Sequence, residues 1–105
     1  KKLPEAKKVI LNECHQAARE KEDNPVAQAA ARAIGQAAST IHTATHSLGI
    51  AFYGAAAVAY EKVGFDKDIS TYDEIAREEV KKMIDELKKV AIKNEPNPVK
   101  VKWYC

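Results

Sequence analysis

The fold is decided by residues 25–63, which read PVAQAAARAIGQAASTIHTATHSLGIAFYGAAAVAYEKV. This stretch holds 13 of the 18 alanines in the chain, and alanine has the highest helix propensity of all residues. The stretch is longer than a usual globular helix. Its TAT segment at 43–45 contains two β-branched hydroxyl residues, which favour a turn over a helix interior. We therefore expect two helices, about 25–42 and 45–63, or one kinked helix.

An amphipathic helix is predicted before this stretch, from about Pro4 to Lys21. Proline fits a first helical turn, where its missing N–H costs nothing. Apolar residues then recur at spacings of three and four, which gives the helix one buried face. That face consists of Leu3, Ala6, Ile10, Cys14 and Ala17. Asn24 and Pro25 separate this helix from the next, with Asn24 as the N-cap and Pro25 at the first helical position.

A charged helix is predicted after the Ala-rich stretch, over about residues 71–93. Gly64 is expected to end the preceding helix as its C-cap, and Ser70 or Thr71 to cap the new one. The apolar stripe of this last helix is Tyr72, Ala76, Val80, Met83, Leu87 and Val90. The tail, residues 94–105, ends in VKVKWYC and could pair as a short strand, pack across the helices or extend freely.

Composition and charge describe a single folded domain over residues 1–105. Hydrophobic residues make up 46% and charged residues 30%, and 17 basic against 15 acidic residues give a net charge of +2. That balance does not imply nucleic acid or a membrane surface, and no apolar run is long enough to cross a bilayer. No signal peptide is recognisable. The expected fold is all-α, an antiparallel bundle of about four helices.

The two cysteines, Cys14 and Cys105, are too few for a disulfide framework. They favour a reducing, cytoplasmic setting. Cys14 lies on the apolar stripe of its helix and is expected to fill the core, where cysteine behaves as a small hydrophobe. Cys105 is terminal, and we assign it no role.

The three histidines, His15, His42 and His46, all lie in the first half of the chain. His42 and His46 are four residues apart, a spacing that can hold a metal on one helix face. However, Cys14 and His15 are neighbours and point about 100° apart on a helix, so they do not easily join the same site. We expect the three histidines to approach one another and predict no metal and no cofactor. They either pack and hydrogen-bond between helices or form a polar cluster at a binding surface.

No motif for catalysis is present. The sequence contains no GxSxG, no Gly-rich phosphate loop and no HExxH. Ser39, Thr40 and Ser47 lie near the histidines, but hydroxyls in Ala-rich helices usually bond back to the chain. We therefore predict that the protein is not an enzyme. Small and polar residues fall along one helical stripe, which we expect to be the closest helix contact. This stripe is Gly35, Ser39, His42, His46, Gly49 and Tyr53.

Three segments of the first half carry a resemblance to a known family. They are CHQAAR at 14–19, AAARAIGQ at 29–36 and TIHTATHSLG at 40–49. Together they resemble the small, all-helical, Ala/His-rich immunity proteins of bacterial polymorphic-toxin systems, over about residues 14–60. The matching residues are His15, Arg19, Arg32, Gly35, His42, His46 and Gly49. One departure is Gln36, which stands where the family pattern has histidine. Glutamine keeps a hydrogen-bonding group but is neither an acid nor a base.

The resemblance implies a protein that neutralises a cognate toxin by direct protein–protein binding. From the balanced charge and the absence of a long apolar run we predict no nucleic acid and no membrane partner. The residues expected at the binding site are His15, Arg19, Arg32, Gln36, His42, His46 and Tyr53. Two alternatives remain open. One is a helical metal- or small-ligand-binding protein that uses the histidine cluster. The other is a structural homo-oligomer, such as a homo-dimer, whose interface is the small-residue stripe.

Overall fold

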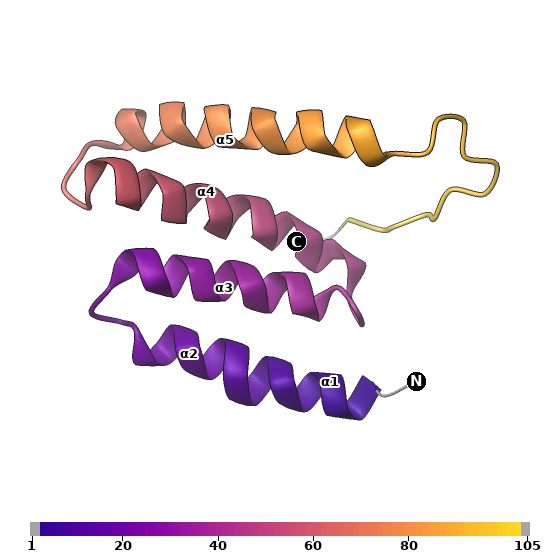
Figure 1. Cartoon of the computed structure of the whole chain (residues 1–105), viewed down its shortest axis with the longest axis horizontal. Coiled ribbons are helices and arrows are strands. Elements are labelled where there is room, and N and C mark those ends of the chain that lie inside the picture. Colours follow the sequence, from indigo (N-terminus) through magenta and orange to yellow (C-terminus); the bar gives the residue numbers. More distant parts are fainter. Residues whose placement is uncertain (1–2, 104–105) are drawn as a thin grey trace.

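The chain forms a layer of antiparallel helices. The computed structural model describes residues 3–103. Its elements are α1 (Leu3–Val9), η1 (Ile10–Cys14), α2 (His15–Glu20), α3 (Pro25–Ser39), η2 (Ala44–His46), α4 (Ser47–Val63) and α5 (Ile69–Val90). The first three elements run on as one helix, and each following helix reverses direction (Figure 1). The predicted all-α class and the packing of about four helices are confirmed.

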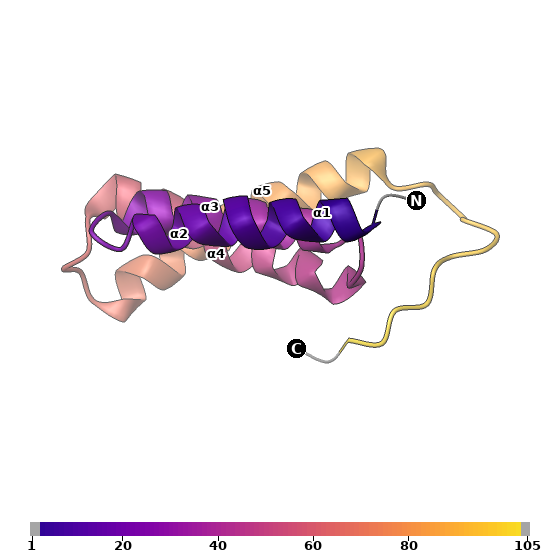
Figure 2. The same cartoon turned by 90° about the horizontal axis from the view of Figure 1, so that it is seen from below.

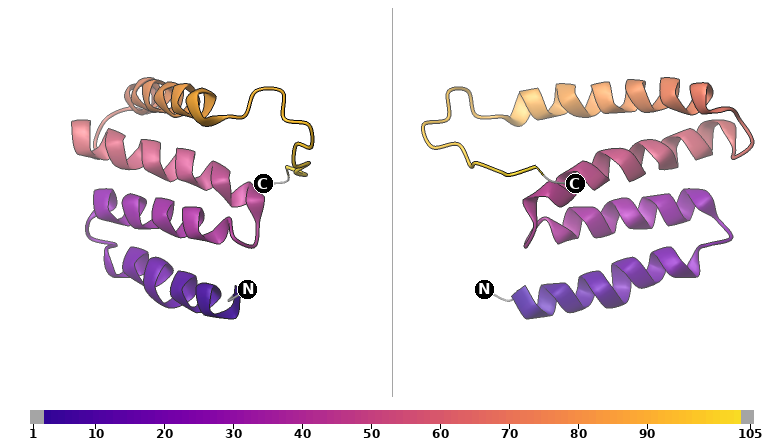
Figure 3. Two further views of the ribbon diagram at one scale, coloured as in Figure 1. Left: turned by 45° about the vertical axis from the view of Figure 1, so that its right-hand side comes forward. Right: turned by 180° about the vertical axis from the view of Figure 1, so that it is seen from behind.

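The helices pack in chain order, with α2 on α3, α3 on α4 and α4 on α5. A view turned by 90° shows that the layer is thin (Figure 2). Two further views show the same side-by-side order of the helices (Figure 3). Its extents are 46 × 33 × 23 Å and its radius of gyration is 15.5 Å, against about 13 Å for a compact domain of this size. The first and last helices lie at opposite edges, so both faces of α3 and α4 remain open in part.

The core of this layer is built from small residues. In the described part of the chain, the buried apolar residues are Ile10, Ala18, Ala29, Ala55 and Ala59. The longest shared contact is between α3 and α4, where alanine and glycine let the two backbones approach closely. The predicted small-residue stripe is divided between two contacts, because Gly49 faces Gln36 of α3 whereas Gly35 faces Cys14 and His15 of the first helix. Burial of alanine removes little apolar area from water, so many large apolar side chains stay exposed at the surface.

The first helix contains a π-turn that sequence periodicity did not predict. Residues 10–14 form η1, with i→i+5 hydrogen bonding. The wider turn rotates the following residues around the helix. As a result Ala18 is fully buried and Ala17 is exposed, so the prediction that Ala17 continues the buried face was wrong. Cys14 is half-buried beside the turn rather than in the core. Cys105 lies outside the described residues.

The expected break in the Ala-rich stretch is confirmed, but it begins earlier than predicted. α3 ends at Ser39, and the Thr40 hydroxyl donates to the Ala37 carbonyl at 2.7 Å. The buried Ser39 hydroxyl donates to the Gly35 carbonyl at 2.8 Å. Thr43 then takes an extended conformation, with φ −143° and ψ 100°. His42 therefore lies in the turn and not on a helix.

Two of the predicted helix caps are confirmed and one is corrected. Asn24 accepts a hydrogen bond from the Ala27 N–H at 3.1 Å, with Pro25 at the start of α3. Gly64 ends α4 with φ +79°, a conformation that glycine adopts without strain. The cap of α5 is Asp68, not Ser70 or Thr71. Its carboxylate accepts from both the backbone N–H and the hydroxyl of Thr71, because a carboxylate satisfies the free N–H groups at a helix start.

An aromatic cluster holds the turn between α4 and α5. Tyr60 packs edge-on against both Phe65 and Tyr72, with ring centroids 5.6 and 5.7 Å apart. The Tyr72 hydroxyl donates to the Gly64 carbonyl at 2.9 Å. At the far end of α5 the two helices diverge (Figure 1), so Leu87 and Val90 of the predicted apolar stripe are exposed.

The tail has no regular structure over residues 91–103. It turns back from the end of α5 and runs to the start of α4 (Figure 1). Val101 is half-buried there, whereas Val99 and Trp103 are exposed. The described tail forms no strand and is exposed over residues 91–100. Of the three arrangements left open by the sequence it fits none fully, because it extends away from α5 and lies against the helices only at its far end, around Val101. Tyr104 lies outside the described residues.

Candidate binding site

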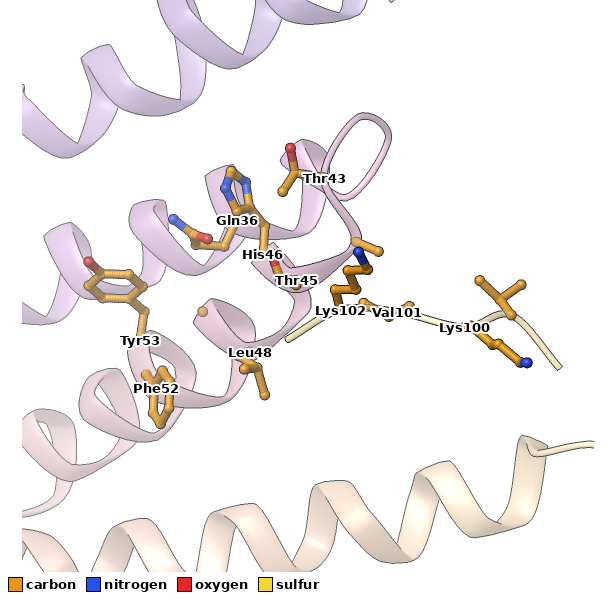
Figure 4. A pocket seen from close by; sticks show the side chains of 13 residues that line it. Gln36, Thr43, Thr45, His46, Leu48, Phe52, Tyr53, Lys100, Val101 and Lys102 are labelled. Atoms are coloured by element: carbon orange, nitrogen blue, oxygen red, sulfur yellow. The ribbon is translucent and has the colours of Figure 1, made fainter. Parts of the chain in front are cut away.

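The tail and the start of α4 enclose a groove of about 700 Å³. Its walls are Gln36 on α3, the turn at 43–46, one face of the first turns of α4, and residues 99–102. We call it the tail groove (Figure 4). Three of the residues predicted to form a binding site line it: Gln36, His46 and Tyr53.

Gln36 lies between the rings of Tyr53 and His46 (Figure 4) and directly against Gly49. A Cβ atom at position 49 would stand 2.5 Å from Oε1 and 2.6 Å from Cδ of Gln36. Real Cβ atoms do not approach other heavy atoms so closely. Glycine at 49 is therefore what allows the glutamine side chain to cross from α3 onto α4.

His42 and His46 are brought together across the turn. Their ring centroids are 5.7 Å apart and their planes meet at 81°. His42 is exposed and His46 half-buried. Within the described residues, Nδ1 of His46 is buried and has no hydrogen-bond partner. A buried polar atom without a hydrogen-bond partner lowers the stability of the folded state. The turn therefore contains a locally unfavourable group at His46.

His15 and Arg19 contact residues outside this pair. His15 packs on Gly35, where an added Cβ would stand 3.5 Å from its ring atoms Cε1 and Nδ1. Arg19 donates to the Gln16 side chain at 3.1 Å on the exposed side of α2. Of the seven predicted site residues, these two and His42 line neither the tail groove nor the grooves between the helices. In the described part of the chain, no group of three His, Cys, Asp or Glu side chains could hold a metal ion.

Arg32 and Tyr53 line a smaller groove of about 320 Å³ between α3 and α4. Phe52 lines this groove, the tail groove and a third groove of about 770 Å³ between α4 and α5. Its side chain is 66% exposed. Sequence reasoning missed Phe52. The signal that could have found it is an aromatic residue beside Tyr53 in a helix rich in alanine and glycine.

In the described chain, the side chains with a shifted pKa are Asp68, Glu79 and Lys82, which stabilise the start of α5 or form ion pairs on it. The hydroxyl of Thr71, and then its backbone N–H, lower the pKa of Asp68. The hydrogen bond from Lys82 at 2.9 Å lowers the pKa of Glu79 and raises that of Lys82. Lys62 on α4 lies 3.6 Å from the same Glu79 carboxylate, which adds a polar link between the last two helices.

The fold and the grooves define a small all-helical protein whose candidate site offers hydrogen-bonding and apolar side chains. No helix of the described chain is long and apolar enough to cross a membrane. The chain belongs to the family described as "Imm-5 like putative immunity protein", whose model matches residues 1–88. The match extends beyond residues 14–60, on which the resemblance rested. No curated protein and no solved structure matches the chain.

Proposed function

We propose that this protein neutralises a bacterial toxin by binding it directly, in the cytoplasm, and that it catalyses no reaction. Membership of an immunity family supports the general role. The observation that carries binding as the mechanism is Phe52, a large apolar side chain that is 66% exposed where three grooves meet. Exposed aromatic residues beside grooves are typical anchors of protein interfaces.

The proposed surface is the part of α3 and α4 around this residue. Tyr53 is 36% exposed beside it, and Arg32 lines the neighbouring groove. Tyrosine and arginine are, with tryptophan, the residues most enriched among those that dominate binding energy. The thin layer leaves this surface open in part, because α2 packs on α3 and α5 packs on α4 from the two edges of the layer.

The test uses a cognate toxin, which is to be sought among the products of the genes beside the gene for this protein. Phe52→Ala is expected to weaken toxin binding about 30-fold or more, which is the loss usual for an interface anchor. Folding should be preserved, since an exposed side chain contributes little to stability. Leu87→Ala is the matched control, because Leu87 is 63% exposed on α5 and does not line any of the three grooves.

Equal binding by the wild-type and Phe52→Ala proteins would show that the chosen surface is wrong. Loss of binding in Leu87→Ala alone would place the interface on α5. A stable wild-type homo-dimer that Phe52→Ala dissociates would instead favour the homo-oligomer alternative. Sedimentation of both variants separates this outcome from toxin binding.

A further inference from the structure

The charged side chains that line the tail groove are all cationic. Its lining contains two lysines, Lys100 and Lys102, and no aspartate or glutamate. Neither lysine is in an ion pair within the described chain. On α4 and α5, by contrast, Lys62, Lys82 and Lys89 each pair with a glutamate. The groove is thus a place where cationic side chains stand without a carboxylate beside them.

The two lysines are placed differently. Lys102 reaches back toward the turn that carries Thr43, whereas Lys100 points outward at the rim (Figure 4). Both are exposed. Between them and the helices lie apolar walls from Leu48, Phe52 and the aliphatic tail residues. A ligand in the groove would therefore meet apolar surface along its length and positive charge at one side.

The groove is lined both by residues inside the family match and by residues beyond it. Gln36, His46 and Tyr53 belong to the segment that the family model matches, residues 1–88, whereas residues 99–102 lie beyond it. The helical wall thus lies inside the family match, and the lysine wall lies outside it.

We propose that the tail groove binds an acidic, partly apolar segment of the toxin, and that Lys102 and Lys100 select it by charge. This inference rests on the proposed function. The tail groove has a volume of about 700 Å³, which lies within the range of about 300–1,000 Å³ usual for ligand-binding pockets. A short stretch of a partner chain, with one or two carboxylates next to an apolar side chain, is therefore the occupant of matching chemistry.

Exposed lysines act mainly on the rate and salt dependence of association. Positive charge at a rim steers an oppositely charged partner, and its effect falls as salt shortens the Debye length. Removal of two exposed ion pairs typically lowers affinity by roughly 10-fold at low salt. Charge reversal should lower it further, and more at position 102 than at 100, because Lys102 points toward the groove.

The test uses a synthetic peptide rich in glutamate and leucine, and the same peptide with glutamine in place of glutamate. Backbone amide resonances of the 15N-labelled protein report where each peptide binds. The glutamate peptide is expected to shift resonances of residues 43–53 and 99–102, and the glutamine peptide to shift them far less. The shifts should fade with added salt and in a Lys100→Glu/Lys102→Glu variant.

The control variant is Lys88→Glu/Lys93→Glu, which makes the same change in net charge at exposed positions outside the groove. It should bind the glutamate peptide like the wild type. Equal shifts with both peptides, shifts elsewhere on the chain, or equal loss in both variants would overturn the inference. So would a short single-stranded oligonucleotide that shifts the groove resonances when the glutamate peptide does not.

Failure of this inference and failure of the proposed function give different results. If the toxin is neutralised equally by the wild type and by Lys100→Glu/Lys102→Glu, direct binding stands and the acidic segment is wrong. If the peptide binds in the groove but the toxin is not neutralised at all, the groove chemistry stands and the proposed function is wrong.

Discussion

Substitution of Gly49 tests the contact that shapes the candidate site. Gly49→Ala adds a Cβ where Gln36 already lies, with Oε1 and Cδ at 2.5 and 2.6 Å from the new atom. Overpacking of this kind costs about 1–3 kcal/mol, and replacing a helical glycine by alanine returns up to about 1 kcal/mol. The free energy of unfolding should therefore fall by about 1 kcal/mol, which lowers the melting temperature by about 4–8 °C.

The physical reason can be isolated with a second substitution. Gln36→Ala removes the atoms that the new Cβ would meet, so Gly49→Ala should become neutral or stabilising in that background. The coupling between the two positions should be about 1–3 kcal/mol. Gly54→Ala is the matched control on the same helix. Its added Cβ would only reach Met83 Cε at 3.5 Å, an ordinary contact, so this change should stabilise the protein by up to about 1 kcal/mol.

Urea unfolding followed by circular dichroism measures all of these free energies. The reasoning would be refuted if Gly49→Ala changed stability by the same amount with glutamine and with alanine at position 36. It would also fail if Gly54→Ala destabilised the protein as much as Gly49→Ala, because the close approach of Gln36 would then explain nothing.

Three further outcomes are expected. Asn24→Ala should lower the free energy of unfolding by about 1 kcal/mol through loss of the α3 cap, and Asn24→Ser, measured by the same urea unfolding, should restore most of it. The Thr71 contacts lower the pKa of Asp68 in the folded state, so its charge stabilises the fold above the unfolded pKa and that contribution is lost as pH falls through the folded pKa. Asp68→Asn should thus be less stable than wild type near neutral pH and equal to it in acid, and a constant difference across that range would contradict the assignment. Finally, because we predict no structural metal, thermal melts with and without a strong chelator should coincide. A fall in melting temperature on chelation would show that folding depends on a bound metal.

The helices could be predicted from the sequence because their signals are local. Alanine enrichment, the Asn24–Pro25 start and the glycine at 64 each act within a few residues, and the structure has a helix or a helix end at each place. The missed features depend on more distant groups. The π-turn at 10–14 carries no glycine or proline, and the choice of Asp68 over Ser70 depended on which oxygen reaches the Thr71 N–H.

The residues of the site were easier to predict from the sequence than their arrangement in space. Gln36, His46 and Tyr53, all predicted for the binding site, share a groove. His46 and Tyr53 lie on the stripe of the helical projection, whereas Gln36 is named through the family resemblance. The projection could not show that His42 leaves the helix after Ser39, because the position of a break is not fixed by periodicity. Nor could it bring residues 99–102 to the start of α4, since that requires knowing how the tail folds back.

The most direct test of direct binding is a titration of the toxin with this protein, with residual toxin activity as the readout. Direct binding predicts that activity falls linearly and reaches its floor at one protein per toxin when both are well above the dissociation constant. Full neutralisation at a small fraction of one equivalent, growing with time, would indicate turnover and contradict the account. An unchanged toxin at large excess of the protein would contradict it as well.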